Sequence, residues 1–228
     1  MASDASTGCA GPPASERAVP AAATDAPVVP AGAADAAGLA RFVRCYDDDL
    51  DADVCAGLVA GFHGMGDAQQ RNGRGVRAGL DGSAWTELDV GRHADAPLLA
   101  FFRHRVSLAL QRYNRDLGLP LPVPDSPLLA PLVLKRYLAG GRDRFQLHFD
   151  AVNEVSDRYL VLLWYLNDVG QGGETLFPLL DLRVAPRRGR LLVFPPYWMF
   201  PHAGLPSPKQ DKYILSTYLR FPGAHSRL

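Results

Sequence analysis

Short apolar runs alternate with glycine- and proline-containing turns from residue 128 onward. This alternation restricts the possible fold classes more than any other feature of the sequence. Strand-sized runs at such close spacing are typical of a sandwich or a double-sheet jelly roll. The 19 prolines and 22 glycines of the 228-residue chain also argue against a mostly helical bundle. The predicted strands are Leu132–Leu138, Arg144–Phe149, Tyr159–Asn167, Thr175–Phe177, Leu182–Ala185, Leu191–Phe194 and Tyr213–Phe221.

The residues that precede this region predict a helical layer. One helix is expected over Ala52–Phe62, after acidic residues that suit a helix N-terminus, and a second over Ala96–Leu117, whose apolar residues form one stripe at helical spacing. A short strand is expected at Arg41–Tyr46, and loop or turns over the glycine-rich residues 63–83. The predicted fold class is therefore α+β, mainly β: a jelly roll with N-terminal support helices packed on one face.

The N-terminal end of the sequence differs in composition from the rest. Residues 1–38 are almost all Ala, Pro, Gly, Ser, Asp and Val, and the first aromatic residue is Phe42. A segment with so few large apolar groups is unable to offset its ordering entropy, so residues 1–38 are predicted to be a disordered Ala/Pro-rich tail. Residues 39–127 are then the N-terminal strand and support helices of the same fold, and residues 128–222 are its β core.

Charge and cysteine content narrow the possible partners and the compartment. The chain has 24 basic and 24 acidic residues, so neither a nucleic acid nor an anionic membrane surface is an expected partner. No apolar stretch reaches the roughly 18 residues of a membrane-spanning helix. Three cysteines are too few for a disulfide-stapled secreted scaffold, and a cytoplasmic location is expected.

A histidine and an aspartate lie two positions apart on one predicted strand. Side chains alternate along a strand, so His148 and Asp150 are expected on the same face, about 7 Å apart along the chain. Together they offer one nitrogen and one oxygen ligand to a shared cavity. The simpler alternative is a histidine whose titration is tuned by a neighbouring carboxylate.

A second histidine, His202, follows a proline-rich turn after the strand Leu191–Phe194. Two imidazoles and one carboxylate form the facial triad that suits non-haem Fe(II) and leaves coordination positions open. A structural zinc site would need a fourth protein ligand, usually cysteine, and no cysteine follows Cys55. We therefore predict an open, catalytic metal site made by His148, Asp150 and His202.

A lysine opens the last predicted strand. Lys212 lies ten residues after His202, at the start of an otherwise apolar alternating run. It could be a strand-end lysine whose ammonium group reaches water. Alternatively, it is a cation directed inward that holds the carboxylate of a metal-bound cosubstrate.

The region from about 131 to 222 resembles the Fe(II)/2-oxoglutarate-dependent oxygenases of the prolyl 4-hydroxylase type. The metal-site candidates match in order and spacing, and so does Lys212. Tyr137 matches the family's active-site tyrosine. Further matching segments are Leu162–Asp168, Gly172–Pro178 and Pro186–Phe194.

The resemblance implies a double-stranded β-helix, a jelly-roll variant, over residues 128–222. It implies Fe(II) held by His148, Asp150 and His202. It also implies 2-oxoglutarate as cosubstrate, with its far carboxylate paired to Lys212 and contacted by Tyr137, and O2 and ascorbate as further requirements. Two positions depart from the family pattern: Val161 replaces a threonine found in some members, for which Thr217 or Ser216 could substitute, and Phe145 replaces a common tyrosine.

The expected function is a dioxygenase that hydroxylates an unactivated C–H bond and releases succinate and CO2. A prolyl residue of a peptide or protein is the favoured substrate. The alternatives are demethylation or desaturation, action on a small molecule such as an amino acid, sugar or natural product, and a jelly-roll binding protein that is non-catalytic or holds another metal. The substrate is expected to contact residues 63–83, 151–157 and 196–201, with Asn153, Glu154 and Trp198 as candidate contacts.

Overall fold

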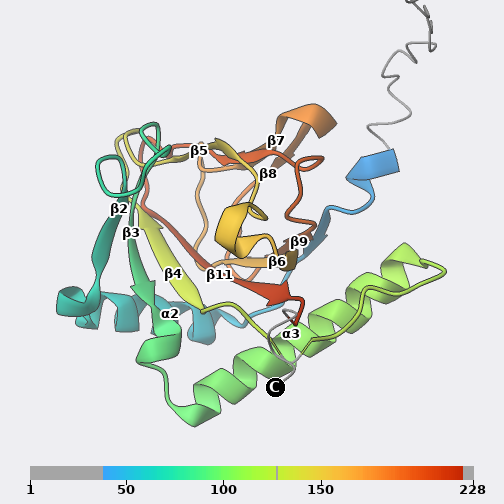
Figure 1. Ribbon diagram of the computed structural model, residues 1–228. Helices are drawn as coiled ribbons and strands as arrows, with labels where there is room; N and C mark the ends of the chain where they lie inside the picture. The colour runs from blue at the N-terminus through green and yellow to red at the C-terminus, as the bar shows by residue number, and fades with distance from the viewer. Residues whose placement is uncertain (1–37, 127, 223–228) are drawn as a thin grey trace, which may run out of the picture. The chain divides into compact units, whose positions relative to one another are not determined.

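The computed structural model describes residues 38–126 and 128–222, whose strands form two antiparallel sheets packed against each other (Figure 1). The larger sheet has the strand order β1-β9-β6-β11-β4-β3-β2, and the smaller one β5-β10-β7-β8. This is the predicted jelly-roll class, so the prediction of the fold class is confirmed. The strands are β1 (Arg44–Tyr46), β2 (Gln70–Gly73), β3 (Ala84–Asp89), β4 (Val133–Tyr137), β5 (Phe145–His148), β6 (Arg158–Tyr165), β7 (Thr175–Phe177), β8 (Leu182–Val184), β9 (Leu191–Phe194), β10 (His202–Gly204) and β11 (Lys212–Arg220).

The central strands of the larger sheet are buried on both faces. In β6, the even-numbered residues from Leu160 to Trp164 belong to a core on the outer side of the sheet, and the odd-numbered residues from Val161 to Tyr165 belong to a core between the sheets. This two-sided burial explains why the strand is a continuous apolar run. The neighbouring β11 has the same alternation, and it is this alternation that directs every second side chain toward the smaller sheet.

Two helices, α2 (Ala52–Gly64) and α3 (Ala96–Leu117), cover the outer face of the larger sheet (Figure 1). The carboxylate of Asp95 accepts a hydrogen bond from the backbone N–H of Leu98 at 2.9 Å and so caps the start of α3. Gly118 ends this helix in a left-handed conformation, with φ of 57°, which glycine adopts at little cost. The predicted bounds of α3 are confirmed, and α2 is two residues longer than predicted.

The helix-side core packs against one face of the larger sheet, so truncation of one of its residues is expected to destabilise the fold. Leu162 has an exposed fraction of 0% in the centre of β6, so Leu162→Ala leaves a cavity and is expected to lower the free energy of unfolding by about 3 kcal/mol. Leu121, which is 84% exposed, is the matched control, and L121A is expected to change stability by less than about 0.5 kcal/mol. Urea unfolding of both variants measures the difference, and equal stabilities would contradict this account of the core.

Some elements differ from the prediction. Strand β2 lies within residues 63–83, which were predicted to be loop or turns, and β3 was not predicted at all. Trp85 of β3 belongs to the core between the sheets and Leu88 to the helix-side core, so the buried residues of this strand are three positions apart and do not show a two-residue period. The strand expected at Arg41–Tyr46 is shorter, because only β1 pairs with β9.

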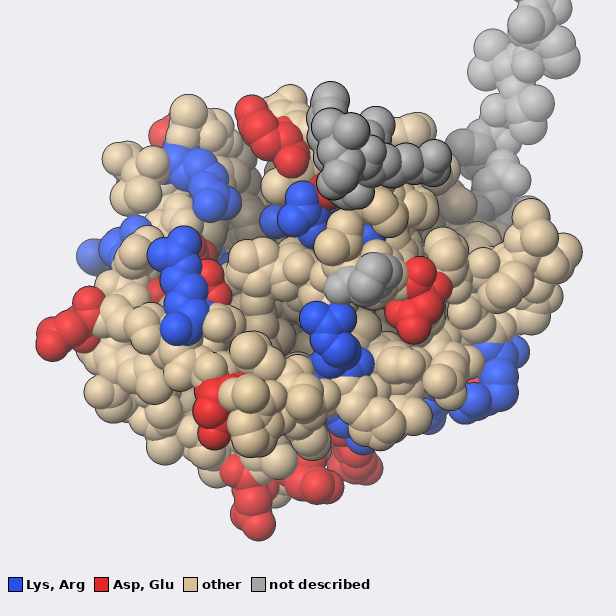
Figure 2. Space-filling view, turned by 60° about the horizontal axis from the view of Figure 1, so that its bottom comes forward, with Lys and Arg blue, Asp and Glu red and all other residues tan. Residues whose placement is uncertain are grey.

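The predicted tail, residues 1–38, lies outside the described residues except for residue 38. Among the helices that are described, none combines the length and the apolar character needed to cross a bilayer. Basic and acidic side chains are intermixed on the face of the molecule in Figure 2.

Candidate metal centre

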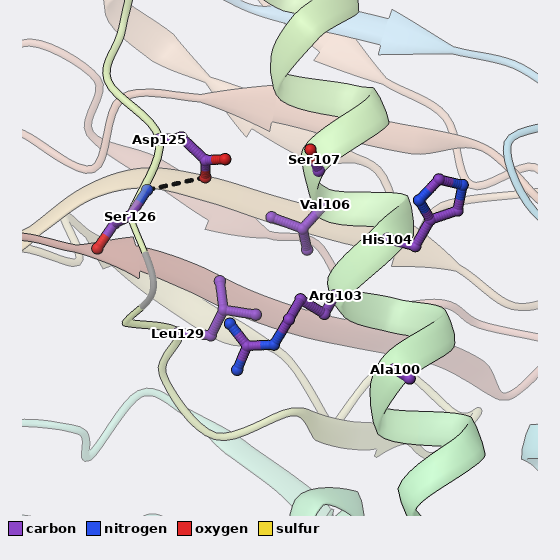
Figure 3. Close-up of a pocket in the computed structure, with 8 residues that line it drawn as sticks. All are labelled: Ala100, Arg103, His104, Val106, Ser107, Asp125, Ser126 and Leu129. Carbon is purple, nitrogen blue, oxygen red and sulfur yellow. Dashed lines mark hydrogen bonds between the residues drawn. The ribbon is translucent and has the colours of Figure 1, made fainter.

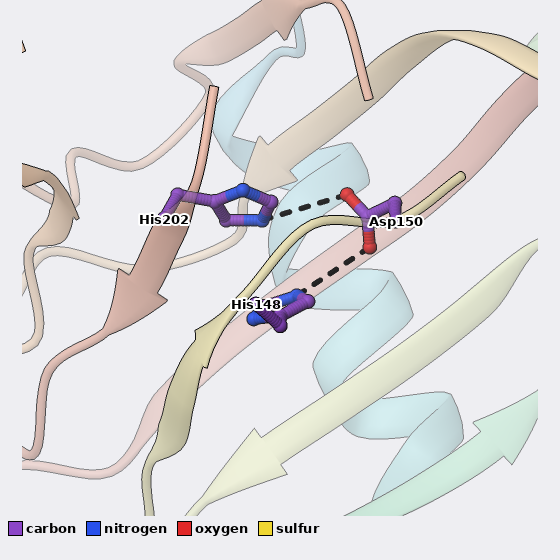
Figure 4. A group of neighbouring side chains, drawn as sticks. All are labelled: His148, Asp150 and His202. Carbon is purple, nitrogen blue, oxygen red and sulfur yellow. Dashed lines mark ion pairs between the residues drawn. The ribbon is translucent and has the colours of Figure 1, made fainter. Parts of the chain in front are cut away.

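Pairing of two short strands brings the three predicted ligands together. His148 is the last residue of β5, Asp150 follows two positions later, and His202 is the first residue of β10. The two strands pair antiparallel with His148 directly opposite His202. One ligand atom from each of the three residues lies within 4.8 Å of the others, and the side chains converge from two segments of the smaller sheet (Figure 4).

The backbone orients both imidazole rings for metal binding. Nδ1 of His148 lies 2.8 Å from the carbonyl oxygen of Gln146, and Nδ1 of His202 lies 3.1 Å from that of Phe200. A carbonyl only accepts hydrogen bonds, so Nδ1 of each ring is the donor, and Nε2 is the nitrogen that faces Asp150. Both Nε2 atoms lie 3.5 Å from carboxylate oxygens of Asp150, on the side where a metal would be held.

The electrostatics of Asp150 and His202 favour the forms that bind a metal. Burial on its own raises the pKa of Asp150, but His202 and His148 outweigh it, and the pKa of this carboxyl falls well below its usual range. Burial lowers the pKa of His202 to about 4, against the opposing effect of Asp150. At neutral pH the site therefore offers a carboxylate, 7% exposed, and a neutral imidazole at His202, a donor set that fits a divalent transition metal such as Fe(II).

Neighbouring groups contact two of the candidate ligands. The hydroxyl of Tyr218 donates a hydrogen bond to Oδ1 of Asp150 at 3.1 Å, and the backbone N–H of Asp150 donates to the carbonyl of Pro196. The ring of Phe145 stacks on His148 with 3.7 Å between ring centroids. Phe145 thus packs its apolar ring against the ring of a candidate ligand.

Lys212 points into the space between the sheets. Its side chain is on the same face of β11 as Ile214 and Tyr218, which belong to the core there, and the residue is only 2% exposed. The ammonium nitrogen donates to the carbonyls of Gly173 at 2.9 Å and Leu205 at 3.4 Å. Burial lowers the pKa of Lys212 to about 7, with Glu174 acting in the opposite direction. The alternative of a strand-end lysine that reaches water is therefore wrong.

One narrow cavity connects Lys212 to the three candidate ligands. Tyr137 also lines it, and the Lys212 ammonium nitrogen lies 4.5 Å from the centroid of the Tyr137 ring. Tyr137 and Lys212 are direct partners in the pairing of β4 with β11. All five predicted site residues therefore face a single cavity, whose other lining residues are Lys135, Phe145, Val161, Leu163, Thr175, Phe194, Gly204, Ile214, Ser216 and Tyr218.

The structure adds two hydroxyl groups, of Tyr165 and Thr175, that the sequence patterns did not identify. The hydroxyl oxygens of Tyr165 and Thr175 lie 2.6 Å apart, and Thr175 lines the cavity. Alternation along the predicted strand Tyr159–Asn167 could have placed Tyr165 on the inner face. Of the two suggested substitutes for the family threonine, Ser216 lines the cavity, whereas Thr217 points to the other side of β11 and donates to the carbonyl of Ala130.

The predicted substrate-facing residues are not at the cavity. Asn153, Glu154 and Trp198 are exposed, Trp198 by 68%, and none of them lines either of the two cavities that adjoin Asp150. Residues 63–83 do contribute to the outer of these cavities, through Ala68, Gln70 and Arg77.

A further cavity, of about 550 Å³, lies on the opposite side of the larger sheet (Figure 3). It is bounded by α3 and by the segment that contains Asp125 and Ser126. His104 of α3 is exposed there. None of the candidate ligands borders this cavity, so it is separate from the metal centre.

The part of the chain that contains the site is similar to known oxygenases. Residues 132–220 match the family model of the 2OG-Fe(II) oxygenase superfamily. Probable prolyl 4-hydroxylase 9 of Arabidopsis thaliana is 30% identical over 115 residues, which are 37% of this chain and 38% of that protein. The chain thus matches well under half the length of this curated relative. The resemblance to prolyl 4-hydroxylase-like oxygenases is confirmed for this part of the chain.

Solved structures of prolyl hydroxylases share the fold. A prolyl-4-hydroxylase of Pseudomonas putida has a TM-score of 0.60 and 21% identity, covering 84% of this chain and 99% of that one. The viral collagen prolyl hydroxylase vCPH of Paramecium Bursaria Chlorella virus-1, in its 2OG complex, has a TM-score of 0.57 and 19% identity, covering 80% and 97%. A prolyl hydroxylase of Trichoplax adhaerens, in complex with a hypoxia inducible factor peptide fragment, has a TM-score of 0.63 and 16% identity, covering 82% of this chain and 90% of that one.

Proposed function

We propose that this protein is an Fe(II)- and 2-oxoglutarate-dependent dioxygenase that hydroxylates an unactivated C–H bond of its substrate, with release of succinate and CO2. The observation that carries the proposal is the convergence of His148, Asp150 and His202 within a region that matches the 2OG-Fe(II) oxygenase superfamily. A prolyl residue of a peptide or protein is the favoured substrate, because the similar proteins are named as prolyl hydroxylases and one of them is seen with a peptide.

Each ligand residue has a defined task in this proposal. His148 and His202 would present their Nε2 lone pairs and Asp150 an anionic oxygen, so that the protein would hold three coordination positions of a bound divalent ion. When bound, Fe(II) with 2-oxoglutarate and O2 supplies an oxidant able to break an unactivated C–H bond. Because the protein contributes three ligands, positions stay open for the cosubstrate and O2.

The inner end of the cavity suits the far carboxylate of 2-oxoglutarate. The Lys212 ammonium provides a positive charge there, and the nearby hydroxyl of Thr175 and the ring of Tyr137 line the same wall. In a buried site an ammonium–carboxylate pair is strong because water does not screen it. Apolar side chains of β6 and β9, among them Leu163 and Phe194, form the rest of the wall and exclude water from the reacting atoms.

The remaining parts of the chain have supporting roles in the proposal. Residues 39–127 belong to the same fold as the β core of residues 128–222, because α2 and α3 cover the outer face of the sheet that contains Lys212 and β1, β2 and β3 extend that sheet. Ascorbate is proposed as the reductant that keeps the iron ferrous. The partner is the substrate itself, with no nucleic acid or membrane partner.

Succinate release tests the proposed function directly. The purified protein with Fe(II), ascorbate, O2 and proline-containing peptides is expected to convert 2-oxoglutarate to succinate, and the peptide is expected to gain 16 Da by mass spectrometry, the mass of one oxygen atom. Omission of Fe(II) or O2 is expected to stop both. Tight Fe(II) binding without any decarboxylation of 2-oxoglutarate would instead favour a non-catalytic binding protein.

A further inference from the structure

A second cavity, of about 340 Å³, adjoins the metal centre on its outer side. It shares Lys135, Phe145, Asp150, Ser216 and Tyr218 with the narrow inner cavity, so the two cavities meet at one of the candidate metal ligands, Asp150. A volume of this size is in the range of small-ligand sites. A substrate group that reaches the metal centre through this cavity must pass these shared residues.

Lys135 occupies the junction without a hydrogen-bond acceptor. It lies in the middle of β4 on the same face as Tyr137, directed between the sheets. Its ammonium nitrogen lies 5.5 Å from the ring centroids of both Trp85 and Phe145. No carboxylate or carbonyl oxygen among the described residues accepts a hydrogen bond from it or forms an ion pair with it within 4.0 Å. An ammonium group in such a partly buried position needs an acceptor, which either water in the cavity or a bound ligand can supply.

The acidic residues around this outer cavity already have partners. Glu87 accepts hydrogen bonds from Asn72 at 2.8 Å and from the Trp85 indole at 2.6 Å. Asp89 pairs with Arg92 at 3.1 Å, and Asp150 belongs to the metal site.

The basic residues are in excess. Arg77, Lys135 and Arg158 all line the cavity, and none of them forms an ion pair with a carboxylate among the described residues. Nε of Arg158 is buried and has no hydrogen-bond partner. Bound Fe(II) and the dianion of 2-oxoglutarate would cancel each other's charge, and Lys212 would balance Asp150. Against these three basic groups stands the single charge of Glu87, so the cavity would keep a net positive charge in the loaded protein.

We propose that Lys135 binds a carboxylate group of the substrate, which positions the neighbouring C–H bond at the metal centre. This inference rests on the proposed function and names the substrate class: a carboxylic acid, either a free amino acid or a peptide whose terminal or side-chain carboxylate lies next to the hydroxylated carbon. Burial lowers the pKa of Lys135 in the free protein, and a bound carboxylate would favour the charged ammonium form.

The test compares acids with their amides on the protein loaded with Mn(II) and 2-oxoglutarate. The pairs are acetate and acetamide, L-proline and L-prolinamide, and the tripeptide Ala-Pro-Ala with a free or an amidated C-terminus, and binding is measured by calorimetry. We expect at least one acid to bind at least about tenfold more tightly than its amide, since a charge-assisted hydrogen bond is lost in the amide. The pair that shows the largest preference distinguishes a free amino acid from a peptide.

Variants of Lys135 test whether this residue causes the preference for the acid over the amide. Lys135→Met is expected to abolish the preference for the acid, Lys135→Arg to keep most of it, and Lys209→Met, at an exposed lysine, to leave it unchanged. A wild-type protein that binds no acid more tightly than its amide, or a Lys135→Met variant that keeps the preference, would overturn the assignment. If Mn(II) and 2-oxoglutarate themselves fail to bind, the proposed function fails; if they bind and the acids show no preference, only this inference fails.

Discussion

Asp150→Asn is expected to abolish detectable Fe(II) binding and all succinate formation while the protein stays folded. The substitution keeps the shape of the side chain and its hydrogen bond from Tyr218, but it removes the anionic ligand that lies between the two Nε2 atoms. Loss of an outer partner of a metal ligand already costs roughly 10–100-fold in affinity, so loss of the ligand itself is expected to cost more. Anaerobic titration with Fe(II), together with thermal unfolding, measures both effects.

Asp143→Asn is the matched control for this experiment. Asp143 is also buried, with 2% exposed, but it forms a bidentate ion pair with Arg71 outside the metal centre. We expect D143N to lower stability, because it leaves the guanidinium of Arg71 without its anionic partner, and to leave Fe(II) affinity unchanged. An Asp150→Asn protein with wild-type iron affinity would remove Asp150 from the proposed site.

Lys212→Met is expected to weaken 2-oxoglutarate binding by about two orders of magnitude without loss of fold. A carboxylate bound in the cavity would lose its buried cation, which costs about 3 kcal/mol. The methionine fills a similar volume, and the free protein no longer buries a charge whose acceptors among the described residues are the carbonyls of Gly173 and Leu205. The stability of the free protein is therefore expected to be unchanged or higher. Calorimetry with 2-oxoglutarate on the Mn(II)-loaded protein, with Fe(II) affinity as control, tests this.

The affinity for 2-oxoglutarate is also expected to depend on pH, because Lys212 titrates. Burial places the pKa of Lys212 at about 7 in the free protein, below its ordinary value, and a bound carboxylate raises it again. Above pH 7 the complex therefore holds a proton that the free protein lacks, so affinity falls as pH rises, by about tenfold between pH 6 and pH 8.

Lys212→Arg separates this titration from that of other groups. Arginine stays charged across this range, so the variant is expected to show an affinity for 2-oxoglutarate that does not change between pH 6 and pH 8. A wild-type affinity that is equally flat would mean that Lys212 is fully charged in the free protein or does not hold the cosubstrate.

Local sequence patterns predicted most of the β core and both helices, because these elements are long enough to carry a clear pattern of apolar and capping residues. In β6 and β11 the apolar residues are continuous because both faces are buried, and α3 is bounded by a capping aspartate and a left-handed glycine. Strand β10 is only three residues long, and its position depends on pairing with β5 and β7. No local pattern marks such a strand, so the sequence identified His202 as a ligand candidate without predicting the strand that orients it.

The sequence by itself determined the residue types of the site, namely two imidazoles, a carboxylate and a lysine in a fixed order, because these are the chemical groups that hold a metal and an anion. Only the tertiary structure decided that Lys212 points inward and that Lys135 stands at the junction of two cavities without an acceptor. The direction of a strand side chain follows from alternation, but whether the face it reaches is core or solvent depends on which sheet packs there. That packing joins segments far apart in the chain, and no local pattern contains it.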